Sequence, residues 1–246
     1  MKVSLFITCL ADQFYPQVGV SVVRLLQRFG CEVDFPADQT CCGQPAFNSG
    51  YVNDARKAAK NHVLAFKNAE YVVSPSGSCT SMIHHYYREL FSGDKVMESE
   101  VDAFISKSYE FTQFLVNMLK VREIPGSFPH SVTYHPACHG ARLLGVRTEP
   151  LELLRSVADL TLVDLPRSQD CCGFGGAFAV KMSDISGAML NEKVEHIAET
   201  KCEYVVSTDL GCLMNIGGQI KRRPSSPIPI HIAELLDTAM SGGTPR

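Results

Sequence analysis

Ten cysteines and no tryptophan distinguish this 246-residue chain from an ordinary enzyme. Eight of the cysteines form two similar sets around the tripeptide Cys-Cys-Gly, at residues 41–43 and 171–173. The first set contains Cys9, Cys41, Cys42 and Cys79, and the second contains Cys138, Cys171, Cys172 and Cys212. Four thiolates match the ligand number of a [4Fe–4S] cluster or of a structural zinc ion. The two sets therefore predict two metal centres.

The spacing of the cysteines shows that the chain is a tandem repeat. One cysteine precedes each Cys-Cys pair by 32 or 33 positions, and another follows it by 37 or 40 positions. The sequence Tyr-Val-Val-Ser stands before the last cysteine in both halves, at residues 71–74 and 204–207. Because four features recur in one order, we expect two cysteine-rich domains, residues 1–124 and 130–246, joined by a Pro- and Gly-containing linker.

The adjacent cysteines favour an iron–sulfur cluster over zinc. Neighbouring α-carbons lie about 3.8 Å apart, so two adjacent side chains usually diverge, whereas four zinc ligands must converge on one atom. An iron–sulfur cluster spreads its irons and accepts thiolates from such a pair, and the following glycine relieves crowding beside it. We expect one [4Fe–4S] cluster per domain. Zinc in one or both sites, a vicinal disulfide and a plain thiol pair are the alternatives.

Several other residues that resemble site residues are expected to be structural. Cys31 and Cys202 lie outside the repeated pattern and are expected to be small buried hydrophobic side chains. The pair His84 and His85 is expected at the surface or at a partner contact. The Gly-Phe-Gly-Gly run at residues 173–176 lacks the spacing of a dinucleotide-binding loop, so we expect it to pack around the second centre.

Two histidines flank Cys138, and either could ligate a metal, donate a hydrogen bond to sulfide or transfer a proton. They are His135 and His139. The first half has no histidine at the corresponding places, which argues against a ligand role common to both halves.

The elements that must position the cysteines alternate between strand and helix. Alternating apolar patterns predict strands at residues 3–7, 33–35, 71–74, 132–134, 160–165 and 204–207. Helical spacing predicts helices at residues 16–29, 51–68 and 183–200, and another opened by Pro150. This order predicts an α/β fold of two tandem Rossmann-like domains with mainly parallel sheets. Most site cysteines then follow the carboxyl end of a strand, where helix N-termini favour thiolates.

Composition excludes several classes of protein. Hydrophobic residues make up 45% and charged residues 20%, and the formal net charge is −3. These values do not fit a disordered chain or a nucleic-acid-binding surface. The apolar stretch at residues 3–11 is too short for the core of a signal peptide, and no run approaches the roughly 18 apolar residues of a membrane span. We therefore expect a cytoplasmic protein, in which clustered thiols serve metal or redox chemistry.

The duplicated pattern resembles the cysteine-rich CCG domain, which is known from the heterodisulfide reductase B subunit and the glycolate oxidase iron–sulfur subunit. Within this group, the chain most resembles the lactate utilization family. The resemblance rests on residues 1–10, 40–46, 74–79, 170–176 and 211–218 and covers essentially the whole chain. One difference is notable. The heterodisulfide reductase pattern ends in Cys-x2-Cys, with five cysteines per domain, but Ser76 and Asp209 replace the earlier cysteine here.

The resemblance implies an iron–sulfur electron-transfer subunit of a cytosolic complex that oxidises L-lactate to pyruvate. It also implies two companions, a ferredoxin-like iron–sulfur protein and a third lactate-utilization subunit, with residues 174–178 as our candidate contact. The chain alone is then expected to oxidise little lactate, and its catalytic residues are unknown. A heterodisulfide reductase-like thiol/disulfide redox subunit and a zinc-stabilised assembly scaffold are the alternative functions.

Overall fold

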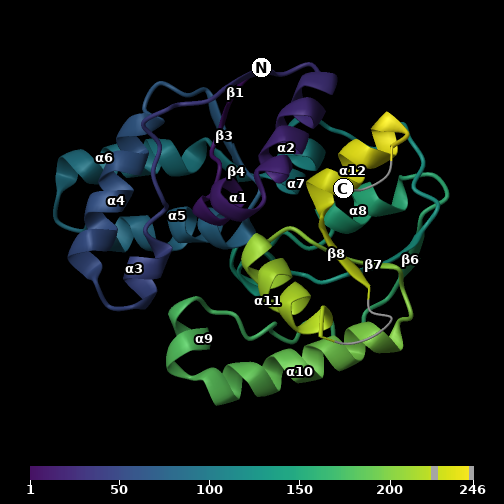
Figure 1. Ribbon diagram of the computed structural model, residues 1–246. Coiled ribbons are helices and arrows are strands. Elements are labelled where there is room, and N and C mark those ends of the chain that lie inside the picture. Colours follow the sequence, from purple (N-terminus) through teal and green to yellow (C-terminus); the bar gives the residue numbers. More distant parts are fainter. Residues whose placement is uncertain (223–226, 244–246) are drawn as a thin grey trace.

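The computed structural model describes residues 1–222 and 227–243, and Figure 1 shows two α/β halves side by side. The elements of the first half are β1 (Lys2–Leu5), α1 (Cys9–Phe14), α2 (Pro16–Arg28), β2 (Glu32–Asp34), α3 (Gln44–Asn48), α4 (Val52–Ala65), β3 (Tyr71–Ser74), α5 (Gly77–Leu90), α6 (Lys95–Ser106), β4 (Ser108–Glu110), α7 (Phe111–Gln113) and the π-helical turn η1 (Phe114–Met118). Those of the second half are β5 (Ser131–Tyr134), the π-helical turn η2 (His139–Leu143), α8 (Glu149–Arg155), β6 (Thr161–Val163), α9 (Ala177–Lys181), α10 (Ser183–Glu199), β7 (Tyr204–Ser207), α11 (Leu210–Ile220), β8 (Ile228–His231) and α12 (Ile232–Ser241).

Each half contains a four-stranded parallel sheet with the same topology. The strand orders are β2-β1-β3-β4 and β6-β5-β7-β8. The registers also correspond, because Val3 pairs with Tyr71 in the first sheet and Val132 pairs with Tyr204 in the second. The expected parallel α/β fold and its duplication are therefore confirmed.

The fourth strand of each sheet was not expected from the sequence. The strand β4 is the three-residue sequence Ser-Tyr-Glu, and β8 is Ile-Pro-Ile-His. Neither has a run of β-branched residues, and a proline normally counts against a strand. Both lie at a sheet edge, where a missing ladder hydrogen bond is tolerated. The helices α6, α11 and α12 were also not among the expected elements.

The halves share a hydrophobic core. One continuous cluster of buried side chains includes Leu25 and Leu26 of α2, Phe114 of η1, and Leu235 and Leu236 of α12. Thus α12, at the end of the second half, packs on α2 of the first half (Figure 1). Smaller cores lie within each half.

Polar contacts reinforce the packing of α2 on α12. The buried Asp237 carboxylate accepts a hydrogen bond from Ser21 Oγ at 3.3 Å. It also lies 3.4 Å from Arg24 Nη1 and 3.6 Å from Arg28 Nη1.

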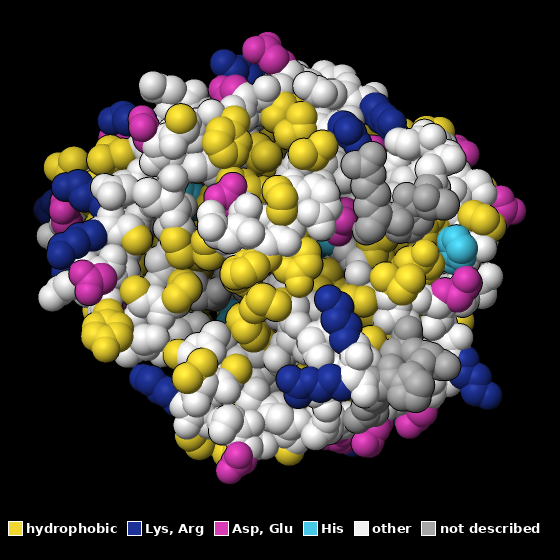
Figure 2. Space-filling model, in the orientation of Figure 1, with side chains coloured by type: hydrophobic (Ala, Val, Ile, Leu, Met, Phe, Trp, Pro, Cys, Tyr) yellow, Lys and Arg dark blue, Asp and Glu magenta, His cyan; other side chains and the backbone are white. Residues whose placement is uncertain are grey.

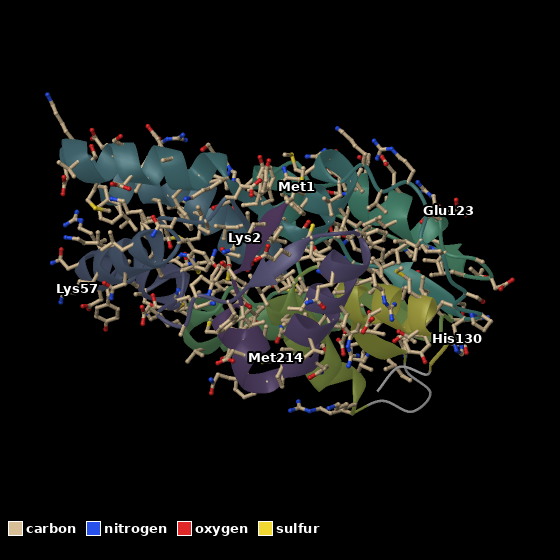
Figure 3. The ribbon with its side chains drawn as sticks, turned by 90° about the horizontal axis from the view of Figure 1, so that it is seen from above. Met1, Lys2, Lys57, Glu123, His130 and Met214 are labelled. Atoms are coloured by element: carbon tan, nitrogen blue, oxygen red, sulfur yellow. The ribbon has the colours of Figure 1, made fainter. Side chains whose placement is uncertain are left out.

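Seen from above, Lys57 of α4 lies at one end of the molecule, and Glu123 and His130 of the connecting segment lie at the other (Figure 3). The connection therefore lies away from the first-half helix α4.

Candidate functional site

Each site cysteine lies at the carboxyl edge of its sheet, close to the start of a helix or helical turn. Cys9 is the first residue of α1, and Cys79 lies in the first turn of α5. Cys138 is the N-cap of η2, and Cys212 lies in the first turn of α11. The Cys-Cys pairs occupy the loops that precede α3 and α9. Backbone N–H groups at such positions favour anionic ligands.

The sulfurs approach one another within each half. The Sγ atoms of Cys9 and Cys41 are 3.9 Å apart, and those of Cys138 and Cys171 are also 3.9 Å apart. The Sγ atoms of Cys172 and Cys212 are 3.2 Å apart. Cys31 and Cys202 are buried elsewhere and line no part of the cavity described below. The structure therefore brings together the sets expected from spacing.

The glycine of each Cys-Cys-Gly turn adopts a backbone conformation that other residues rarely adopt. Gly43 has φ +86° and Gly173 has φ +81°, in the left-handed region. A Cβ at Gly173 would lie 2.6 Å from the carbonyl oxygen of Ser186 in α10, so the turn also packs directly on that helix. Left-handed geometry and close helix packing thus explain the glycine without reference to a cluster.

The two sets of cysteines line one cavity of about 500 Å³. All eight cysteines contribute to its wall, together with Leu10 of α1, Pro45 of α3, Val180 of α9 and Leu210 of α11. It opens between α3 and α9, and hydrophobic side chains surround this hollow in the space-filling view (Figures 1 and 2). One metal centre per domain predicts one pocket in each half. The prediction of separate pockets was wrong, because the close packing of the halves merges them.

Ser76 and Asp209, which replace the additional cysteine of the heterodisulfide reductase pattern, connect the halves across this cavity. Ser76 Oγ donates a hydrogen bond to Asp209 Oδ2 at 3.0 Å, and the Ser78 N–H donates to the same oxygen at 3.0 Å. The Gly211 N–H donates to Asp209 Oδ1 at 3.0 Å. A buried carboxylate thus joins the N-termini of α5 and α11. The sequence shows that Ser76 and Asp209 replace cysteines, but it does not show that these two side chains are in contact.

One thiol in each half is far more acidic than its neighbours. Hydrogen bonds from adjacent cysteines lower the pKa of Cys41 and of Cys171 to about 2. The same hydrogen bonds, together with burial, raise the pKa of Cys9 and of Cys138 above the usual value. Cys41 and Cys171 are thus the most readily ionised thiols of their sets, and a metal would displace protons from the remaining thiols.

The carbonyl oxygen of the second cysteine in each pair is held by different donors in the two halves. Tyr87 Oη donates to the Cys42 carbonyl at 2.9 Å, and it also contacts Nδ1 of the buried His62 at 2.8 Å. In the second half, Asn215 Nδ2 donates to the Cys172 carbonyl at 2.9 Å. Sequence analysis missed these residues because no motif marks them; only their place in α4, α5 and α11 identifies them.

The histidines differ in their surroundings. His139 lines the cavity, with Nδ1 3.9 Å from Cys138 Sγ. His135 is 1% exposed, and neither ring nitrogen has a hydrogen-bond partner among the described residues. Burial, with a smaller contribution from the Lys193 ammonium, lowers the pKa of His135 to about 3, so its imidazole is neutral. His84 and His85 instead contact the carbonyls of Ser108 and Leu143.

These residues fit a thiolate-ligated metal group. The donor set consists of two groups of four sulfurs beside helix N-termini, in a mostly apolar cavity. A ring nitrogen of His135 and the sulfurs of Cys172 and Cys212 lie within 4.8 Å of one another, and the described residues contain no other such group of three. Soft thiolates suit iron–sulfur clusters and zinc. The carboxylates and carbonyls that calcium or magnesium prefers are scarce here.

The fold and the two cysteine sets define a protein built from two cysteine-rich CCG domains, whose sequence profile matches residues 3–84 and 132–217. The chain is 52% identical over 243 residues to lactate utilization protein A of Oceanobacillus iheyensis, covering 99% of each chain. It is 54% identical over 237 residues to the protein of the same name from Geobacillus thermodenitrificans, covering 96% of this chain and 99% of that one. The chain therefore belongs to the lactate utilization protein A family.

A solved structure shares the fold. The crystal structure of a hypothetical protein from Helicobacter pylori matches with a TM-score of 0.68 and 10% identity, over 97% of this chain and 49% of that one. At this identity the likeness concerns the fold alone. Within residues 1–222 and 227–243, no helix is both long and apolar enough to cross a bilayer.

Proposed function

We propose that this chain is an iron–sulfur electron-transfer subunit of a cytoplasmic complex that oxidises L-lactate to pyruvate. The observation that carries the proposal is the meeting of two four-cysteine sets in one cavity. The substrate comes from the name of relatives about half identical to this chain over nearly its whole length. Bound iron–sulfur clusters would supply one-electron transfer.

The residues of the chain would prepare the site in three ways. Cysteine thiolates would hold the metal, with Cys41 and Cys171 the most readily ionised of their sets. The donors Tyr87 and Asn215 would fix the two Cys-Cys turns. The apolar wall would limit access of water, which strengthens electrostatic interactions within the cavity.

Oxidation of lactate itself is assigned to a partner subunit. Removing two electrons and two protons from an alcohol needs an acceptor and a base. Apart from cysteines, the only described ionisable side chains that line the cavity are His139 and Asp209. Asp209 already accepts three hydrogen bonds that connect the halves. We therefore propose that this chain works with a ferredoxin-like iron–sulfur protein and a third subunit.

A test of this function compares the chain alone with the reconstituted complex. Anaerobically purified protein should oxidise little lactate with an artificial acceptor, and activity should appear when both partners are added. Robust turnover by the single chain would contradict the assignment of lactate oxidation to a partner. A Cys172→Ser variant should fail to support the complex, whereas Cys202→Ser should support it.

A zinc-stabilised scaffold is the second candidate, and one distance favours it. The sulfurs of Cys9 and Cys41, and those of Cys138 and Cys171, are 3.9 Å apart. This distance is close to the edge of a ZnS₄ tetrahedron, which is about 3.8 Å for Zn–S bonds of about 2.3 Å. A scaffold would contain zinc without acid-labile sulfide, and Cys172→Ser would weaken assembly of the complex. Metal and sulfide analysis therefore separates the two functions.

A further inference from the structure

The two cysteine sets occupy equivalent places in the duplicated fold, and a corresponding backbone hydrogen bond in each half aligns His135 with Phe6. The Phe6 N–H donates to the Val73 carbonyl at 2.9 Å, and the His135 N–H donates to the Val206 carbonyl at 2.8 Å. Phe6 precedes Cys9 by three residues, as His135 precedes Cys138. Where the first half has a benzyl side chain, the second half therefore has an imidazole.

The imidazole of His135 is buried without a polar partner. The side chain is 1% exposed, and neither Nδ1 nor Nε2 finds a hydrogen-bond partner in the part of the chain that the structure describes. An unpaired buried polar group costs about 1–3 kcal/mol. Phe6, at the equivalent position, has no such group and packs against the ring of His62 with centroids 4.1 Å apart. The ring nitrogens of His135 are thus buried without a hydrogen-bond partner among the described residues.

The ring of His135 lies beside two site sulfurs. One of its nitrogens and the sulfurs of Cys172 and Cys212 lie within 4.8 Å of one another, whereas the described residues of the first half form no comparable group of three. The backbone of His135 is fixed on both sides, because its carbonyl accepts a hydrogen bond from Ser207 Oγ at 2.9 Å. The side chain therefore reaches Cys172 and Cys212 from a rigid strand end.

We propose that His135 is a nitrogen ligand of the second metal centre in place of one of its four thiolates, so that this centre has mixed thiolate and imidazole ligation while the first has thiolates only. The inference rests on the proposed iron–sulfur function. It explains why an imidazole without a hydrogen-bond partner among the described residues is buried beside Cys172 and Cys212. Imidazole in place of thiolate raises the reduction potential of iron–sulfur centres. The two centres should accordingly differ in potential, with the second higher.

The test uses the complete chain with ¹⁵N-labelled histidine, purified anaerobically and reduced with dithionite. Electron–nuclear double resonance should detect a strongly coupled histidine nitrogen in the wild type. The Cys42→Ser variant should retain this signal, because Cys42 lies in the first half and His135 in the second. His135→Phe, which installs the residue of the first half, should lose the signal and shift the higher reduction potential downward. His130→Gln, which alters a histidine outside the cavity that pairs with Glu203, should leave both readouts unchanged.

The outcomes separate this inference from the function on which it rests. Iron and sulfide in both halves without a coupled histidine nitrogen in the wild type would overturn the role of His135 and leave the electron-transfer function standing. A signal that persists in His135→Phe would do the same. Protein without iron or sulfide would overturn the proposed function and the ligand role together. The wild-type measurement decides the question even where a variant folds poorly.

Discussion

At the scale of single residues, different side chains in the two halves donate a hydrogen bond to the carbonyl oxygen of the second cysteine of the Cys-Cys pair. Tyr87 reaches the Cys42 carbonyl from the last turn of α5, and Asn215 reaches the Cys172 carbonyl from the middle of α11. The second cysteine of each pair is also buried, and its pKa is raised by hydrogen bonds to neighbouring thiols and by burial. These thiols would ionise only on metal binding.

The second cysteine of each pair should therefore be indispensable for its own centre. Cys42→Ser and Cys172→Ser should each lose roughly half of the iron, since a serine oxygen is a poor ligand for soft metals. The matched controls Cys31→Ser and Cys202→Ser alter buried thiols outside the cavity and should keep near-normal iron. Iron analysis of the four proteins makes the comparison. Equal losses in all four would contradict the division between site and structural cysteines.

Glu110 should give the folded protein a distinctive pH dependence. Burial raises the pKa of this carboxyl to about 7, although three hydrogen bonds to Glu110 Oε2 oppose the shift. The unfolded chain ionises near pH 4.5. Between these values the folded state retains a proton that the unfolded state has lost, so the contribution of Glu110 to stability falls as pH rises, by roughly 1.4 kcal/mol per pH unit. The buried imidazoles of His62, His135 and His231, whose pKa values are lowered by burial, act in the opposite direction below about pH 6.5.

Chemical denaturation of the apoprotein from pH 4.5 to 7.5 measures this contribution. Glu110→Gln, whose amide oxygen can still cap α7, should lack this contribution, so its free energy of unfolding should rise relative to that of the wild type between pH 4.5 and 7, by roughly 1.4 kcal/mol per pH unit. The exposed Glu123→Gln should reproduce the wild-type slope. A Glu110→Gln protein with an unchanged slope would show that this carboxyl does not titrate in the predicted range.

At the scale of elements, the N-termini of α5 and α11 meet at Asp209. This carboxylate accepts hydrogen bonds from Ser76 Oγ, from the Ser78 N–H and from the Gly211 N–H. It belongs to the second half, whereas two of its three donors belong to the first. Asp209 therefore sets the position of one cysteine-bearing helix relative to the other.

Removing the Asp209 carboxylate should destabilise this junction. Asp209→Ala leaves three donors without their acceptor, and we expect a loss of about 3 kcal/mol. For a chain of this size the melting temperature should fall by roughly 6–12 °C. Calorimetry of the apoprotein, with the exposed Asp38→Ala as control, gives the comparison. A change of less than one degree would show that the junction contributes little to holding the halves together.

The elements differ in how far the sequence could predict them. The Tyr-Val-Val-Ser strands β3 and β7 were predicted with the bounds that the structure shows, because valine-rich segments carry a strong strand signal. The strands β4 and β8 were not predicted, since their sequences are short and partly polar or contain proline. The cysteine sets could be assembled from spacing alone. The partners of Asp209 and the carbonyl donors could not, because they depend on how helices distant in sequence pack.

At the scale of the whole molecule, the duplication produces one cavity rather than two. The packing of α2 on α12 places both halves around a shared core, and the two cysteine sets then face the same cavity. No local pattern in the sequence encodes that arrangement, which depends on contacts between residues more than 200 positions apart, such as Ser21 with Asp237. The two proposed iron–sulfur centres would then lie in one cavity, where electrons could pass between them over a short distance.

The measurement that tests the central claim most directly is the iron, acid-labile sulfide and zinc content of the anaerobically purified chain. Because eight cysteines form two sets of four, we predict iron and sulfide in comparable amounts, with broad visible absorbance that bleaches on reduction. Reconstituted protein that contains zinc alone, with no sulfide and no visible absorbance, would contradict the account of this chain as an iron–sulfur electron carrier.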